Sequence, residues 1–110
     1  ILDGDRITRI DRGIAAEEAD GEYIGVACLT AAGAGQFIDT YHRVAAAHAG
    51  RPWREAVVFE KAYLILLFQE MIEQGADIRA APTHGDYMEI DTEEDLRLAN
   101  EQWIHTFGQS

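Results

Sequence analysis

Basic residues are scarce in this sequence. Nine Lys and Arg residues stand against 20 Asp and Glu residues, so the formal net charge is -11, and Lys61 is the only lysine. A chain this acidic repels the phosphates of nucleic acids and the head groups of an anionic membrane. We therefore expect no nucleic-acid partner and no membrane partner. Small phosphorylated ligands stay compatible with the charge, because a divalent cation can bridge two anions.

Cysteines and long apolar runs are also nearly absent. Cys28 is the only cysteine, which excludes a disulfide framework and a thiolate metal cluster. It lies within the apolar residues 24–29, where we expect it to pack in the core as a small hydrophobe. The longest apolar run, residues 62–68, is too short to cross a bilayer. The first residues do not resemble a signal peptide, and we expect a cytoplasmic protein.

The remaining composition is that of one globular domain over residues 1–110, with 47% hydrophobic and 26% charged residues. Apolar patterning predicts strands alternating with helices, which favours an α/β fold. We expect a partial Rossmann-like αβα layered fold, with a mixed sheet and three main helices. The expected strands are residues 7–10, 23–29, 78–82 and 87–90, and the expected helices are residues 34–49, 54–74 and 92–106.

The second expected helix is apolar on every side at residues 62–68. A helix of this kind must be covered all round. It is therefore either the central helix of the core or a helix that a second subunit partly covers. Gly75 is expected to end it.

Two carboxylates lie close together near the last helix. On a strand over residues 87–90, Met88 and Ile90 would face the core, and Tyr87, Glu89 and Asp91 would face the other way. Neighbouring carboxylates repel each other unless a cation lies between them, and oxygen ligands suit Mg²⁺ or Mn²⁺. The structural alternative is that Asp91 is the N-cap of the last helix, with Glu94 completing a capping box. His84, in the preceding loop, is a further candidate to contact a ligand.

Three stretches of the chain carry recognisable motifs, DGDRITRI at residues 3–10, GEYIGVA at 21–27 and GDYMEIDTEEDL at 85–96. They resemble the sugar-nucleotidyltransferase-like superfamily, and within it the cytidylyltransferases for phosphocholine and for phosphonates. The third is similar to the family's aromatic-x-Glu-Ile-Asp-Thr-x-x-Asp-Leu motif. Their order and spacing also agree with the family, and the resemblance covers only the second half of its catalytic domain.

The resemblance implies a role for each matching position. Asp91 matches an aspartate that ligates the catalytic Mg²⁺, and Glu89 matches the carboxylate beside it. Glu22 and Gly25 match the strand that lines the acceptor pocket, and Tyr87 is placed to face a cationic amine. The implied reaction is attack of an acceptor phosphate or phosphonate on the α-phosphorus of CTP, with release of pyrophosphate.

Two departures from the family pattern separate this chain from a complete enzyme. The Gly-rich nucleotide-binding loop with its Arg and Lys residues is missing, and Gly33-Ala34-Gly35 is only a lone Gly-x-Gly. Ile65 and Leu66 stand near the place of a polar Thr-Asp pair. Because the chain begins at Ile1, we expect a processed product or a piece of a longer protein. We expect the acceptor- and metal-binding half of a nucleotidyltransferase, inactive alone.

Two other functions remain open from the sequence. The missing loop and the apolar second helix favour a non-catalytic, stand-alone homodimeric domain derived from the same fold. His84, Glu89 and Asp91 would instead suit a small metal-dependent hydrolase unrelated to that family.

Overall fold

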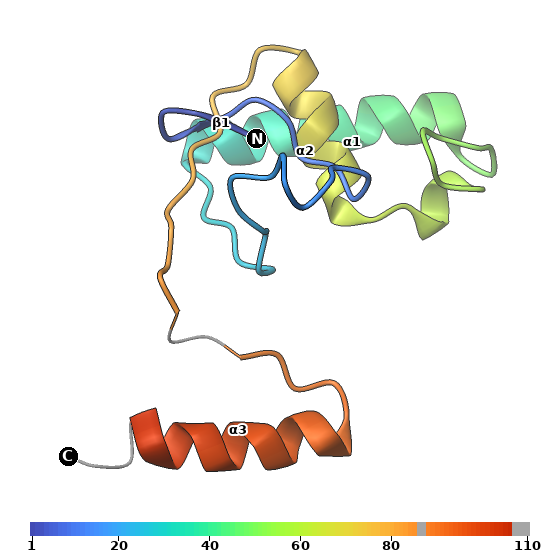
Figure 1. Cartoon of the computed structure of the whole chain (residues 1–110). Helices are drawn as coiled ribbons and strands as arrows, with labels where there is room; N and C mark the ends of the chain where they lie inside the picture. Colours follow the sequence, from blue (N-terminus) through green and yellow to red (C-terminus); the bar gives the residue numbers. More distant parts are fainter. Residues whose placement is uncertain (86–87, 107–110) are drawn as a thin grey trace.

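The computed structural model describes residues 1–85 and 88–106, with side-chain surroundings through residue 102 (Figure 1). In this part of the chain it is a small mixed α/β protein with three α-helices and a two-stranded sheet. Its elements are β1 (Leu2–Asp3), β2 (Arg6–Ile7), α1 (Ala31–His48), the 3-10 helix η1 (Phe59–Lys61), α2 (Leu64–Glu73) and α3 (Glu93–Thr106).

The two strands form a tight antiparallel hairpin at the N-terminus. Leu2 pairs with Ile7, and Gly4 takes the left-handed conformation in the turn, with φ of 64°. The expected strand at residues 78–82 lies beside β2, because the Ile7 N–H donates to the Ile78 carbonyl at 2.8 Å. Only a single bridge, between Arg6 and Arg79, forms there. The expected strand 7–10 is correct only at Ile7, because β2 begins at Arg6 and ends at Ile7.

Two of the expected strands are wrong for the described residues. Residues 23–29 form no strand, and Val26 is 77% exposed. Cys28 is exposed too, so its expected place in the core is wrong. Residues 88–90 also form no strand, and Met88 and Ile90 lie exposed instead of facing a core. An apolar run becomes a strand only where it pairs with another strand, and within the described residues no strand or bridge pairs with either segment.

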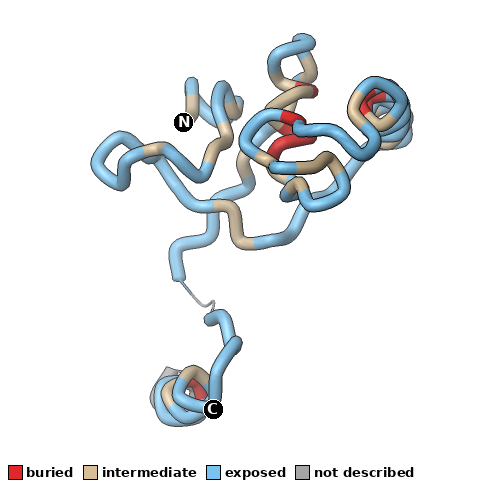
Figure 2. Tube along the Cα trace, turned by 90° about the vertical axis from the view of Figure 1, so that its right-hand side faces the viewer, coloured by how far each residue is buried: buried red, intermediate tan, exposed pale blue. Residues whose placement is uncertain are grey.

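α1 and α2 pack against each other and hold the core. Val44 of α1 contacts a cluster that contains Trp53, Leu66 and Leu67, all of them at most 6% exposed. Thr30 begins α1, because its hydroxyl accepts from the Gly33 N–H at 2.9 Å. Figure 2 shows that buried residues concentrate where these two helices meet.

α2 begins ten residues later than expected, at Leu64. Trp53 and Ala56 close a tight turn by exchanging backbone hydrogen bonds of 3.1 and 2.9 Å, and Arg54 within it has φ of 51°. The expected end of α2 at Gly75 is confirmed. Gly75 takes φ of 89°, and its N–H donates to the Ile72 carbonyl at 2.9 Å, as in a Schellman motif.

α3 confirms the expected last helix and lies apart from α1 and α2 (Figures 1 and 2). Residues 81–92 connect it to the rest of the chain without a strand or helix among the described positions. The Cα radius of gyration is 17.1 Å, whereas a compact domain of this length has about 13 Å. The chain is therefore much more extended than a closed globular domain.

Candidate functional site

The N-terminus of α3 is closed by a capping box formed by Thr92 and Asp95. The Asp95 N–H donates to the Thr92 hydroxyl oxygen at 3.0 Å, and the Thr92 N–H donates back to the Asp95 carboxylate at 3.1 Å. The same carboxylate accepts from the Asp91 N–H at 3.1 Å. These hydrogen bonds lower the pKa of Asp95 below its ordinary value. The hydrogen bond from the Asp91 N–H has the largest effect.

This geometry corrects the expected capping residues. The cap lies one residue later than the sequence pattern suggested, at Thr92 and not at Asp91. Glu94 does not complete the box, because its carboxylate pairs with Arg97 on the next turn of α3. Thr92 and Asp95 form the box instead, because a hydroxyl and a carboxylate three residues apart satisfy two backbone donors at once. An Asp91–Glu94 box would have required α3 to begin one residue earlier.

The Asp91 carboxylate consequently has no structural role within the described residues. Asp91 is exposed, and its side chain makes no hydrogen bond or ion pair to another described residue. Glu89, two residues earlier, is also exposed and does have an interaction partner. Because residues 88–90 are not a strand, the two carboxylates lie on an irregular segment that leads into the positive end of a helix.

The other expected site residues lie on different segments. Glu22 and Gly25 are exposed in the segment that precedes α1, where Gly25 has φ of 91°. His84 is exposed beside Gly85, in a turn where the Thr83 hydroxyl donates to the Gly85 carbonyl at 2.8 Å. Tyr87 lies outside the described residues. Figure 1 shows the segment before α1 on the body with α1 and α2, whereas the segment that leads into α3 lies away from that body.

The described residues contain no group of three His, Cys, Asp or Glu side chains placed to hold a metal ion. A shallow hollow of about 240 Å³ lies between α1 and the end of α2, and it includes Asp39, Thr40, Arg43 and Gln74. None of the expected site residues lines it.

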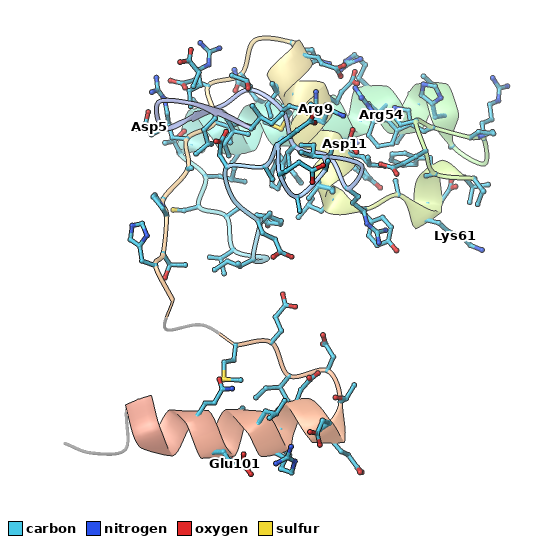
Figure 3. The ribbon with its side chains drawn as sticks, viewed as in Figure 1. Asp5, Arg9, Asp11, Arg54, Lys61 and Glu101 are labelled. Atoms are coloured by element: carbon cyan, nitrogen blue, oxygen red, sulfur yellow. The ribbon has the colours of Figure 1, made fainter. Side chains whose placement is uncertain are left out.

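An ion-pair cluster that sequence reasoning missed ties the body together. Glu70 of α2, whose side chain is 19% exposed, pairs with Arg54 from the turn before η1 and with Arg43 of α1. Arg54 pairs with Glu73 as well, and it is labelled on the body in Figure 3. Arg43 and Glu70 are 27 positions apart, so no local pattern could have indicated this cluster.

Comparison with known proteins identifies no family for this chain. No protein-family model, no curated protein and no solved structure matches it. Among the described residues, no helix is both long enough and apolar enough to cross a membrane.

Proposed function

We propose that this chain is the acceptor- and metal-binding half of a Mg²⁺-dependent nucleotidyltransferase that transfers cytidylyl groups from CTP to a phosphate or phosphonate. The proposal rests on the resemblance of residues 3–10, 21–27 and 85–96 to the cytidylyltransferases. In it, Asp91 and Glu89 hold the metal, and Glu22, Gly25, Tyr87 and His84 contact the acceptor.

The observation that carries the proposal is the placement of the helix cap. The strongest structural explanation for an aspartate at position 91 was N-capping, and Thr92 takes that role with Asp95. The Asp91 carboxylate is left exposed at the helix N-terminus without a partner among the described residues. A carboxylate that the fold does not use is available to a ligand.

Two carboxylates are a suitable protein contribution to a Mg²⁺ site. Mg²⁺ retains several waters and binds through one or two carboxylates together with substrate phosphates, so it needs no closed cage of protein ligands. The N-terminus of α3 adds backbone dipoles that favour an anion such as a phosphate close by. The metal would supply charge neutralisation and alignment of the phosphates.

The proposed enzyme needs further elements to be complete. The αβα layering would require strands beside residues 23–29 and 88–90, which are not strands here. It would also require a Gly-rich loop with basic residues for the triphosphate, because Lys61 is the only lysine. We therefore propose that the chain alone does not transfer nucleotides.

Titration with Mn²⁺, followed by electron paramagnetic resonance, tests the metal site directly. We expect Asp91→Asn to weaken Mn²⁺ binding at least about tenfold without lowering helix content, because the carboxylate supports no described contact. Thr92→Ala should do the reverse, lowering the helix content of α3 while leaving Mn²⁺ affinity in place. Glu93→Gln is the matched control, since it removes a neighbouring exposed carboxylate.

The activity test uses the natural gene product and measures pyrophosphate release from CTP with phosphocholine or a phosphonate as acceptor. Asp91→Asn should abolish the turnover. Equal Mn²⁺ binding by Asp91→Asn and by Glu93→Gln would refute the metal role of Asp91. Full turnover in the Asp91→Asn protein would refute the proposed function.

A further inference from the structure

The chain exposes far more surface than a closed monomer of its size. Its accessible surface is 8274 Å² for 12.2 kDa, whereas a compact monomer of that mass exposes about 6,100 Å². The excess is about 2,200 Å² per chain. Two chains that hid this area against each other would bury an amount typical of obligate homodimers, which bury about 2,000 to 5,000 Å² in total.

One apolar part of this surface lies on the body, on and beside η1. Val57 is 73% exposed, Tyr63 58% and Leu64 48%. Tyr63 and Leu64 belong to the apolar run at the start of α2, whose later residues Leu66 and Leu67 are buried. The run is therefore covered on one side only.

Basic residues without ion-pair partners lie around the same segment. The Arg12 guanidinium stacks over the Tyr63 ring, 4.3 Å from its centroid. Lys61 ends η1 and extends away from the ribbon in Figure 3. Arg51 lies next to η1, because its carbonyl accepts from the Phe59 N–H at 2.8 Å. Within the described residues none of these three cations has an ion pair.

We define the basic apolar patch as the exposed residues Val57, Lys61, Tyr63 and Leu64 together with Arg12, which stacks on Tyr63. On a chain with a net charge of -11, such a patch fits an acidic helix that also has an apolar side. Glu60 lies in this segment as well, where its carboxylate accepts from the Gly50 N–H at 2.8 Å, and Arg12 and Lys61 together outnumber it.

α3 has the matching chemistry. Its first turn contains Glu93, Glu94 and Asp95, and Leu96 directly after them is 49% exposed. Figures 1 and 3 show α3, with Glu101 labelled, separated from the body that holds the patch. Asp95 closes the cap of α3 and Glu94 pairs with Arg97, whereas Glu93 has no ion pair within the described residues and Leu96 is uncovered there.

We propose that this protein forms a two-fold homodimer in which α3 of each copy binds the basic apolar patch of the other. Reciprocal exchange covers both patches and both helices in one closed assembly. It also needs no rearrangement of either chain, since α3 is already held away from its own body. The proposal does not depend on the metal site or on nucleotide transfer.

Charge exchange tests the pairing. Sedimentation equilibrium should give twice the 12.2 kDa chain mass for the wild type. Lys61→Glu and Glu93→Lys should each raise the dimer dissociation constant about tenfold or more, because like charges then face each other. A mixture of the two variants should restore dimers, since both pairings become complementary. The controls are Arg6→Glu, another exposed cation with no ion pair in the described part of the chain, and Asp39→Lys on α1, and both should dimerise like the wild type.

Disulfide trapping separates exchange between copies from closure within one chain. In a Cys28→Ser background, a mixture of Leu64→Cys and Leu96→Cys chains should yield a cross-linked heterodimer, while neither chain alone should yield that product. A monomeric wild type at all concentrations would overturn the proposal. So would a dimer that Lys61→Glu leaves intact, or a Leu64→Cys/Leu96→Cys double variant that cross-links only within one chain. Circular dichroism of each variant checks that these exposed substitutions preserve the fold.

Discussion

Replacing Glu70 by Gln should destabilise the protein more than any other single exposed or half-exposed charge change on α2. The Glu70 carboxylate accepts from Arg54, from Arg43 at 3.2 Å and from the Gln74 amide at 3.0 Å, and its side chain is only 19% exposed. Hydrogen bonds to a charged group stabilise by about 1.5 to 3 kcal/mol. We expect Glu70→Gln to lower the free energy of unfolding by about 2 kcal/mol and the melting temperature by about 10 °C.

The effect has a defined pH dependence. The pKa of Glu70 lies below its ordinary value of 4.5, mainly because the carboxylate accepts a hydrogen bond from Arg54. A group with a lowered pKa in the folded state stabilises above its unfolded pKa, and this stabilisation is lost as the pH falls through the folded pKa. The stability difference between the wild type and Glu70→Gln should therefore be constant near neutral pH and shrink below pH 4.5.

Glu73→Gln is the matched control for this measurement. Glu73 pairs with the same Arg54, but its side chain is 53% exposed, so its ion pair is worth less than about 1 kcal/mol. Urea unfolding followed by circular dichroism, repeated over a series of pH values, gives both differences. The reasoning is refuted if Glu73→Gln costs as much as Glu70→Gln, or if the Glu70→Gln difference persists unchanged in strong acid.

Three further predictions follow from the burial and backbone geometry. Leu67→Ala, at a core position, should lower the free energy of unfolding in urea by about 2 to 5 kcal/mol. Val26→Ala, at an exposed position outside the basic apolar patch, should change it by less than about 0.5 kcal/mol, and equal effects would contradict the core assignment. Gly75→Ala should lower the free energy of unfolding by about 1 to 2 kcal/mol, because residue 75 has a left-handed backbone. Gly35→Ala within α1 should raise the same free energy by about 0.5 to 1 kcal/mol. Cys28 should react completely with a thiol reagent in the native protein, and protection until unfolding would show that it is buried.

The candidate site was only partly predictable from the sequence. The residue types before α3 indicated both a cap and a cation site, and they did not decide which carboxylate served which purpose. The structure gives the cap to Thr92 and Asp95, and leaves Asp91 exposed. The Glu70 cluster could not be predicted, since its members come together only when the turn around Arg54 and both helices pack.

The sequence by itself placed α1, α3 and the end of α2, though not the start of α2, because a helix satisfies its backbone groups within one segment. The spacing of apolar residues placed α1 and α3, and Gly75 marked the end of α2. Tertiary structure alone decided which apolar runs became strands, because a strand depends on a neighbour that can lie anywhere in the chain or on another chain. Residues 23–29 pair with no strand among the described residues, and Val26 and Leu29 remain exposed while Tyr23 packs against Phe68 of α2.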